Sequence, residues 1–302
     1  MLDLNSLPLP RLFAELTADG CLDRLVDAAL DEDLRDAGDV TSDSIIDPVL
    51  TAEALVVARS AGVAGGLACG QRICGEHVRF ESIVKDGDAF GPRMTLAKVA
   101  GPLRHILGVE RTLLNIIGRL SGIATVTSRF VEAIKGTNAV VCDTRKTTPG
   151  MRNLEKYAVR CGGGTLHRIG LYDAALYKDN HLALIPPEQL AETVKVAAIA
   201  ARRYHDLRFV EVEVDSLEQL KRLLTIEPGV IDIVLLDNMP PPMMGEAVKM
   251  RDAANASLQL EASGGVNLDT VRAIAESGVD RISIGALTHS VACLDVGLDI
   301  AT

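Results

Sequence analysis

The chain has 302 residues, of which 48% are hydrophobic and 24% are charged. These fractions are typical of folded proteins and exclude a generally disordered chain, while the length favours a large domain with a smaller companion. The formal net charge is −10, so a cationic face for nucleic acid would oppose the overall balance, and we expect no nucleic-acid partner.

The cysteines and the N-terminal segment indicate where the protein works. The six cysteines are scattered, without a Cys-x-x-Cys pair or a cysteine–histidine array at zinc spacing, which favours reduced thiols. The first residues carry acids and prolines and lack the basic start and apolar stretch of a signal peptide. No window of about 18–20 apolar residues could span a bilayer. We therefore expect a cytoplasmic protein with no membrane partner.

The N-terminal part of the chain predicts a small α/β domain. Residues 11–35 have apolar side chains at helical spacing and end at the turn-like run 36–44. Segments 54–59 and 94–99 are short and β-rich and lie between glycine-rich turns, as expected of a small sheet with a helix or two packed on it. We place this first domain at residues 1–110.

A long helix-compatible stretch follows at residues 109–135 and is expected to link two domains. Gly118 and Gly122 lie four residues apart on one of its faces. Because glycine has no side chain, the pair predicts that another backbone approaches the helix closely there.

The rest of the chain alternates between strand-like and helix-like runs, which predicts parallel strands. The strand-like runs are apolar almost throughout, as in strands buried on both faces. They lie at residues 139–147, 174–181, 209–214, 231–238, 258–265 and 281–286, with helix-like runs near 151–161, 187–204, 216–225, 243–254 and 268–277. Six units favour an α/β barrel short of eight repeats over residues 111–286, although a doubly wound open sheet has the same rhythm.

Polar residues stand at the C-terminal end of every apolar strand run. In chain order they are Asp143, Thr144, Arg145 and Lys146; Lys178, Asp179, Asn180 and His181; Glu211 and Glu213; Asp237 and Asn238; Ser263, Gly264 and Gly265; and Gly285. In α/β barrels this rim is where the active site is built. A single such residue is more often a solvated strand end, but six strands in succession favour a site.

Four cationic residues, Arg145, Lys146, Arg168 and Lys178, are expected at one mouth of the barrel, where His167 can add a donor. Arginine suits a planar carboxylate because its fork bonds bidentately, whereas lysine acts as a point charge on phosphate oxygens. A ligand that carries both groups is implied. The alternative for each residue is a surface salt bridge worth about 0–1 kcal/mol.

Two carboxylates, Glu213 and Asp237, end neighbouring strands beside these cations. Hard oxygen ligands with few protein contacts suit Mg²⁺, which shares a diphosphate with the protein. The pair could instead hold ribose hydroxyls or merely neutralise the cations. Glu211 has the same strand parity as Glu213, so either could point into the site.

Two glycine-containing loops follow the last strands. Ser263, Gly264 and Gly265 lie between a strand and a helix, and Gly285 and Ala286 take the same place one unit later. Adjacent loops of this kind hold phosphate on backbone N–H groups, so we expect a phosphate site here.

These motifs resemble the quinolinate phosphoribosyltransferases, also called carboxylating nicotinate-nucleotide pyrophosphorylases, along nearly the whole chain. The segments that carry the resemblance are EDLRDAGDVTS (32–42), ERTLLNIIGRLSGIAT (110–125), DTRKTTPGMRNLEKYAVRCGGG (143–164), HRIGLYDAALYKDNH (167–181), VEVEVDSLEQL (210–220), VLLDN (234–238), EASGG (261–265) and IGALTHS (284–290).

The resemblance implies an N-terminal α/β sandwich followed by an incomplete parallel α/β barrel. It also implies a homodimer in which the small domain of one subunit caps the barrel of the other, with residues 287–302 returning to the small domain. Two departures stand out: Leu166 precedes His167 where the family has asparagine, and Tyr177 precedes Lys178 where an aliphatic residue is usual. Neither removes a charged group.

The resemblance also assigns roles to the rim residues. Around quinolinate it places Arg145, His167, Arg168 and, from the partner subunit, Arg111. For phosphoribosyl pyrophosphate and its Mg²⁺ it gives Lys146, Lys178, Glu213 and Asp237, with Thr144 beside them. For the 5′-phosphate it gives Ser263, Gly264, Gly265, Ile284, Gly285 and Ala286.

The expected activity is therefore transfer of the phosphoribosyl group to quinolinate, with release of pyrophosphate and carbon dioxide, in NAD biosynthesis. Three alternatives stay open. One is a barrel lyase or aldolase with a Schiff base at Lys178, which leaves Arg111, Arg145 and Arg168 without a role. The others are a phosphoribosyltransferase for another acidic base, such as the paralogue found with molybdate-transport systems, and a non-enzymatic sensor of phosphorylated metabolites.

Overall fold

The computed structural model describes residues 2–301, which form two compact units. The sandwich unit comprises residues 6–128, 147–163 and 287–301, and the barrel unit comprises residues 2–5, 129–146 and 164–286. No helix within residues 2–301 combines the length and apolar character needed to cross a membrane.

The sandwich unit is built on a four-stranded antiparallel sheet in the order β12-β1-β5-β3. Its strands are β1 (Thr51–Ala58), β3 (Arg79–Ser82), β5 (Thr95–Pro102) and β12 (Val296–Ile300), and a separate pair is formed by β2 (Gly62–Val63) and β4 (Ala89–Phe90). Residues 287–302 were expected to return to the small domain. Strand β12 of this segment pairs with β1, with Ala54 opposite Ile300.

The helices of this unit include α1 (Leu9–Thr17), α2 (Cys21–Leu34), α3 (Val40–Ile45), α4 (Gly70–Cys74) and α6 (Arg152–Cys161). The single helix expected over residues 11–35 is two helices, because Gly20 takes a left-handed conformation at φ 76° and separates α1 from α2. Helix α3 is capped by Asp39, whose carboxylate accepts the N–H groups of Thr41 and Ser42.

The long helix α5 (Leu103–Ala133) confirms the prediction drawn from its two glycines. A Cβ atom added to Gly118 would lie 2.7 Å from the carbonyl oxygen of Leu294, and one added to Gly122 would overlap the carbonyl of Ala292. The Leu294 N–H donates to the Gly118 carbonyl at 2.8 Å. The glycines therefore let the C-terminal segment lie directly on the helix.

The compact units differ from the expected boundary at residue 110. Most of α5 belongs to the sandwich unit, where Gly65 exchanges hydrogen bonds with the Ser121 hydroxyl at 3.1 Å. Helix α6, expected in the barrel, also belongs there, because its Tyr157 donates to Asp86 at 2.9 Å and its Asn153 donates to the Leu16 carbonyl.

The barrel unit holds a six-stranded, all-parallel sheet in the order β6-β11-β10-β9-β8-β7. Its strands are β6 (Val140–Cys142), β7 (Ala175–Tyr177), β8 (Val210–Val214), β9 (Ile233–Asp237), β10 (Gln259–Ser263) and β11 (Arg281–Ser283). Within residues 2–301, β6 and β7 are the unpaired edges, so the barrel is incomplete. Strands β7 to β11 follow one another in chain order across the sheet, without the reversal of a doubly wound sheet, so that alternative is set aside.

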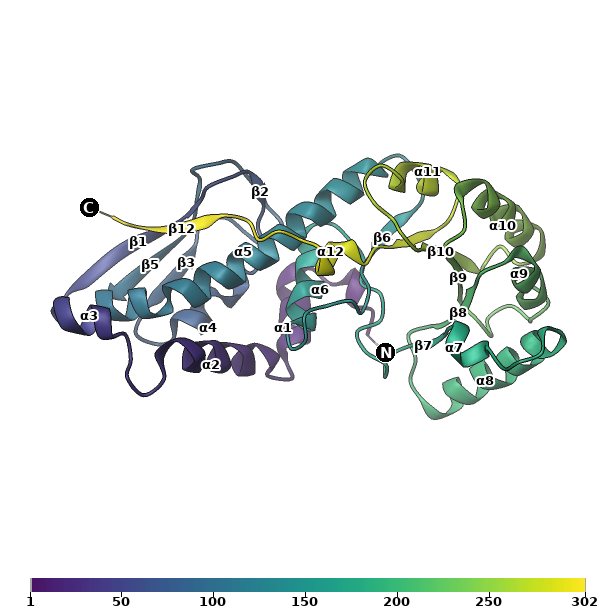
Figure 1. The fold of residues 1–302 in the computed structure, drawn as a ribbon, viewed down its shortest axis with the longest axis horizontal. Coiled ribbons are helices and arrows are strands. Elements are labelled where there is room, and N and C mark those ends of the chain that lie inside the picture. Colours follow the sequence, from purple (N-terminus) through teal and green to yellow (C-terminus); the bar gives the residue numbers. More distant parts are fainter. Residues whose placement is uncertain (1, 302) are drawn as a thin grey trace. The chain divides into compact units, whose positions relative to one another are not determined.

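Helices α7 (Asp179–Leu182), α8 (Leu190–Tyr204), α9 (Leu217–Leu223), α10 (Pro241–Ala254) and α11 (Val271–Glu276) connect these strands, and α12 (Ala286–His289) follows β11. In Figure 1, α8 to α11 lie along the outside of the curved row of strands. The central strands β8, β9 and β10 are buried along most of their length, as their apolar runs predicted. Their carboxyl ends all meet at one rim.

Candidate active site

The rim gathers the polar residues that follow the strands. The register places Asp237 of β9 opposite Ser263 of β10, and Glu213 of β8 opposite Leu235 of β9. Lys178 follows β7 directly and caps the start of α7, where its N–H donates to Nδ1 of His181 at 3.0 Å. Because the strands are parallel, these side chains come to the same end of the barrel.

An acid–base group lies on one side of the rim. The Lys178 ammonium forms an ion pair with Glu213, whose side chain is only 9% exposed. Burial and then the nearby Glu213 carboxylate raise the pKa of Asp237, while Asn238 and Lys178 act in the opposite direction. Two carboxylates and one lysine therefore form a single electrostatic group, as the sequence predicted.

The parity question between Glu211 and Glu213 has a structural answer. Glu211 and Glu213 are two residues apart on β8, so their side chains lie on the same face of the strand. Glu213 is nearer the rim and reaches Lys178. Glu211 is fully buried, deeper in the barrel. Glu213 is therefore the carboxylate available to a ligand.

The loop after β10 is joined to the end of β9. Asn238 takes a left-handed backbone conformation at φ 54°, and its N–H donates to the Ser263 carbonyl at 2.9 Å. Its side-chain amide donates to Asp237 at 2.7 Å. Gly264 has φ +103°, and a Cβ atom there would overlap the side-chain oxygen of Asn238, whereas one on Gly265 would meet nothing within 4 Å.

In the second expected phosphate loop, residues 284–286, the first residue differs from the two that follow it. The N–H of Ile284 donates to the Cys142 carbonyl at 3.0 Å, and the Ile284 side chain is 1% exposed. Its N–H therefore extends the strand pairing and is not available to the phosphate that the resemblance placed at Ile284. Gly285 and Ala286 follow it at the start of α12.

Two arginines interact electrostatically on the other side of the rim. Arg168 is only 7% exposed, and burial and then the charge of Arg145 lower its pKa, against the effect of Glu211 and Asp173. Arg168 also donates to the Ala174 carbonyl at 3.3 Å. Like charges held together in a partly desolvated place favour an anionic ligand that lies between them.

The remaining predicted residues lie in two different places. Thr144 shapes the turn after β6, because its hydroxyl accepts the N–H of Lys146 at 3.0 Å. Arg111 lies on α5 in the sandwich unit, with a 65% exposed side chain 3.8 Å from Glu110.

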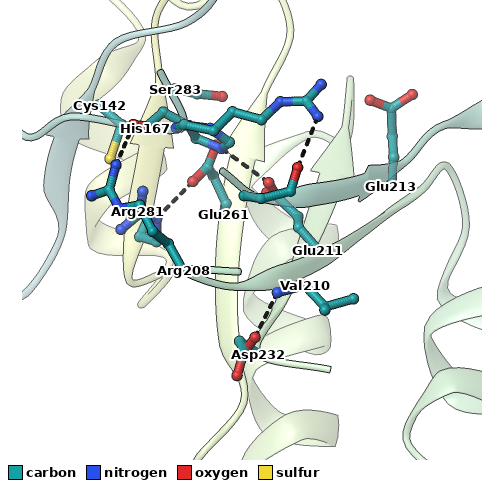
Figure 2. A network of polar contacts seen from close by, with 12 residues as sticks. Cys142, His167, Arg208, Val210, Glu211, Glu213, Asp232, Glu261, Arg281 and Ser283 are labelled. Carbon is teal, nitrogen blue, oxygen red and sulfur yellow. Dashed lines mark hydrogen bonds and ion pairs between the residues drawn. The ribbon is translucent and has the colours of Figure 1, made fainter. Parts of the chain in front are cut away.

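A cluster of four ionisable side chains lies inside the barrel (Figure 2). His167 Nε2 lies 2.9 Å from Glu211 Oε2 and 3.2 Å from Glu261 Oε1. On the other side of Glu261, Arg281 Nε is 2.7 Å from Oε2. Both glutamates are fully buried and His167 is 5% exposed. Isolated charges would be unstable there, so the cluster must be close to neutral.

The cluster reaches neutrality by keeping a proton. Burial works to lower the pKa of His167, but Glu261 and Glu211 outweigh it and raise the pKa to about 10. Burial and then Glu261 raise the pKa of Glu211. Burial opposes ionisation of Glu261 too, but His167 and Arg281 lower its pKa to about 2. The proton belongs to the coupled group, which then carries one negative charge against the positive charge of Arg281.

The position of that proton follows from the backbone. The N–H of Arg168 donates to His167 Nδ1 at 2.8 Å, so Nδ1 must keep its lone pair and the ring N–H is on Nε2. The additional proton therefore belongs on a carboxyl, and Glu211 is the one whose pKa is raised, by burial and then by Glu261.

The same geometry bears on metal binding. Ligand atoms of His167, Glu211 and Glu261 lie within 4.8 Å of one another, as in a metal site. A histidine that binds a metal through Nε2 normally donates from its other nitrogen to an acceptor, whereas Nδ1 here faces an N–H donor. Glu261 is also engaged in an ion pair with Arg281. The cluster is therefore organised around a proton.

Sequence reasoning named Asn238 only as a rim residue, and it missed Glu261 and Arg281 as contributors to the site. Asparagine is enriched among residues with positive φ, and a glutamate inside an apolar strand run is unusual. The first signal is present at Asn238 and the second at Glu261.

A cavity of about 320 Å³ opens at the opposite, amino end of the strands. It is lined by Leu2, Asp3, Asn5, Leu166, Arg208, Phe209, Asp232, Ile233, Gln259 and Arg281. That end of an α/β barrel usually serves stability, and the polar rim at the other end holds the candidate site.

Comparison with known proteins agrees with this geometry. Residues 39–121 match the model of the quinolinate phosphoribosyl transferase N-terminal domain, and residues 123–299 match that of the C-terminal domain. A nicotinate-nucleotide pyrophosphorylase [carboxylating] of Mycobacterium leprae is 41% identical over 277 residues, covering 90% of this chain and 94% of that protein. A probable nicotinate-nucleotide pyrophosphorylase [carboxylating] of Bacillus subtilis is 41% identical over 266 residues, covering 87% and 88%.

Solved structures give the same result. The nicotinate-nucleotide pyrophosphorylase of Francisella tularensis superposes with a TM-score of 0.83 at 32% identity, covering 100% of both chains. That of Ehrlichia chaffeensis superposes with a TM-score of 0.81 at 37% identity, covering 92% of this chain and 98% of that one. The chain therefore belongs to the quinolinate phosphoribosyl transferase family.

Proposed function

We propose that this protein transfers the phosphoribosyl group of phosphoribosyl pyrophosphate to quinolinate and releases pyrophosphate and carbon dioxide, giving nicotinate mononucleotide for NAD biosynthesis. The observation that carries the proposal is that His167 joins the segments of Arg145 and Arg168, through Asp143 and the Arg168 N–H, so that the charge of Arg145 acts on Arg168. Quinolinate has two carboxylates on adjacent ring carbons. A dicarboxylate therefore relieves the repulsion between the arginines, and each fork can bond bidentately.

The other side of the rim suits the phosphoribosyl donor. Lys178 beside Glu213, with Lys146 at the end of β6, supplies positive charge where pyrophosphate would leave the anomeric carbon. The pyridine nitrogen then attacks that carbon from the opposite face. The resulting pyridinium stabilises the electron pair left on the ring carbon when the adjacent carboxylate leaves as carbon dioxide, and a proton from water then forms the C–H bond there, so no organic cofactor is needed. The protein mainly positions and neutralises.

Mg²⁺ is the metal that the family implies, and the residues present fit it. Glu213 and Asp237 offer oxygen ligands, and the mutual effect of these carboxylates on the pKa of Asp237 indicates an excess of negative charge that a cation would relieve. Glu213 and Asp237 would hold the ion with few protein contacts. When bound, Mg²⁺ neutralises the charge of the leaving pyrophosphate.

A second copy of the chain is part of the proposal. Arg111 is exposed, and the nearby acid, Glu110, is 3.8 Å away. We infer a homodimer in which Arg111 of one subunit completes the quinolinate site of the other. We also infer a cytoplasmic enzyme. In support, none of the six cysteines, all within the described residues, forms a disulfide.

The decisive experiment mixes purified protein with quinolinate, phosphoribosyl pyrophosphate and Mg²⁺ and follows nicotinate mononucleotide by mass spectrometry. Nicotinate is run in parallel as the competing base. Product from quinolinate alone is expected. Product from nicotinate alone would overturn the choice of base, and release of no pyrophosphate with either base would leave a binding protein or a related transferase.

The Schiff-base alternative has a separate test. A Schiff-base lysine attacks as the neutral amine, whereas the amine of Lys178 is ion-paired with Glu213. Borohydride reduction in the presence of candidate carbonyl substrates is expected to leave Lys178 unmodified, and a trapped adduct on this residue would contradict the transferase assignment.

A further inference from the structure

Every polar group of His167 has a partner inside the barrel unit. Its N–H donates to Asp143 Oδ1 at 2.9 Å, and its carbonyl accepts from Arg208 at 3.3 Å. In the ring, Nδ1 accepts the N–H of Arg168, while Nε2 lies against Glu211 and Glu261. The structure therefore gives His167 a fixed position and a fixed ring orientation.

The partners of His167 connect it to both quinolinate arginines. Asp143 stands two residues before Arg145, at the end of β6, and Arg168 is the next residue after His167. The histidine thus joins the two segments that carry the guanidinium groups, which come from different parts of the sequence. A rotation of its ring would release the Arg168 N–H and change the spacing between the arginines.

Two kinds of contact hold the ring in place. The Phe209 ring packs edge-on against it, at 5.1 Å between centroids and an interplanar angle of 90°. The single Nε2–H lies between the Glu211 and Glu261 oxygens, at 2.9 and 3.2 Å. Glu261 is itself fixed by Arg281, at 2.7 Å, and the contacts from Arg281 through Glu261 to His167 can be followed in Figure 2.

We propose that Glu261, held by Arg281, is a positioning residue of the phosphoribosyl transfer, because together with Glu211 it holds the His167 ring and so sets the spacing of Arg145 and Arg168. The inference rests on the proposed function for its kinetic consequence. Its structural part, a single ring tautomer fixed by the buried carboxylates, is independent of activity.

The first test is kinetic and uses Glu261→Gln. This substitution keeps the shape and one acceptor oxygen but removes the charge that pairs with Arg281. Misplacement of the arginines is expected to raise the KM for quinolinate by about 10- to 100-fold. The KM for phosphoribosyl pyrophosphate should stay within about twofold of wild type, because Lys178, Glu213 and Asp237 form a separate group of interacting charges. An unchanged KM for quinolinate in the folded variant would overturn the proposal.

A matched control separates positioning from loss of stability. Arg251 is also buried, and it pairs with Asp280 at 2.7 Å without contacting His167. Arg251→Met should lower the unfolding temperature while it leaves the KM for quinolinate unchanged. Should Arg251→Met raise this KM as much as Glu261→Gln does, the effect would be general instability and the positioning role would fall.

The second test observes the ring directly. The chain has six histidines, so ring-¹⁵N labelling gives few signals, and that of His167 is identified by its absence in His167→Gln. The wild-type ring should hold one tautomer, protonated on Nε2 alone, and Glu261→Gln should cause averaging between tautomers. A wild-type ring protonated on both nitrogens, or already averaging, would contradict the proposal.

Two further outcomes keep the inferences separate. Stoichiometric metal in the purified protein that disappears in Glu261→Gln would turn the cluster into a metal site and overturn the positioning role. If wild type fails to turn over quinolinate, the proposed function falls, and the ring signals still decide whether the carboxylates fix His167.

Discussion

The side-chain amide of Asn238 donates a hydrogen bond to the Asp237 carboxylate at 2.7 Å. The same residue donates its backbone N–H to Ser263 at 2.9 Å and has a left-handed backbone at φ 54°. One asparagine therefore ties the expected Mg²⁺ ligand to the loop expected to hold phosphate. This coupling makes the two parts of the phosphoribosyl pyrophosphate site sensitive to the same local change.

Alanine at Gly264 should harm the enzyme far more than alanine at Gly265. Both glycines have positive φ, which costs a residue with a side chain about 1–2 kcal/mol, but only at Gly264 would the new Cβ overlap the Asn238 side chain. Steady-state kinetics are expected to give a markedly higher KM for phosphoribosyl pyrophosphate in Gly264→Ala and a small change in Gly265→Ala. Equal effects would show that backbone strain alone decides, and would remove the role assigned to Asn238.

Arg145→Ala should lose most nicotinate mononucleotide formation. With one of the two neighbouring guanidinium groups gone, the attraction for a dicarboxylate falls, at a typical cost of about 2–5 kcal/mol for a desolvated charge pair. The thermal shift that quinolinate induces in wild type should disappear with it. Arg203→Ala, which removes an arginine from the outer helix α8, is the control and should keep both. Near-normal turnover in folded Arg145→Ala would contradict the residue assignment.

Removal of Mg²⁺ with excess EDTA should stop turnover, and added Mg²⁺ should restore it. Because Glu213 and Asp237 are the carboxylates placed at the rim, Glu213→Gln and Asp237→Asn should each need more Mg²⁺ for half-maximal rate, by about tenfold for every 1.4 kcal/mol of binding lost. Asp215→Asn changes an exposed acid two residues beyond Glu213 and should leave the Mg²⁺ requirement unchanged. Full activity in EDTA would remove the metal from the mechanism.

Lys178→Ala should lose most turnover as well, because it takes away the cation paired with Glu213. The variant leaves a 91% buried carboxylate beside Asp237 without its partner, so some loss of stability is also expected. Lys178→Ala/Glu213→Gln removes both charges and should recover the stability while it stays inactive. Activity in either folded variant would exclude Lys178 from the reaction.

Much of this site could be predicted from local sequence patterns. The rim residues follow apolar strand runs, and parallel pairing then brings Glu213 and Asp237 to one edge whatever the details of packing. The spacing of Gly118 and Gly122 similarly predicted a close backbone contact, because a helix face is defined by spacing alone. Such features depend on the periodicity of single elements.

The rest depends on which elements lie opposite one another. Glu261 and Arg281 come from neighbouring strands, and their burial with His167 could not be predicted without the strand order. Helix α6 follows a barrel strand yet packs in the sandwich unit, because Tyr157 and Asn153 find partners there. A left-handed residue such as Asn238 is equally set by its surroundings, since asparagine only tolerates that conformation.

The stability that Glu261 contributes should be lost in acid. His167 and Arg281 outweigh burial and lower the pKa of Glu261 from 4.5 to about 2, so its carboxylate stabilises the folded state above pH 4.5, and this contribution is lost as the pH falls toward 2. The shift corresponds to about 3 kcal/mol. Urea unfolding should therefore show Glu261→Gln far less stable than wild type at pH 7, with the difference shrinking between pH 4.5 and 3. Glu276→Gln, at an exposed ion pair with Arg272, should show no such convergence. A constant difference between wild type and Glu261→Gln over this range would mean that Glu261 acts through its shape rather than its charge.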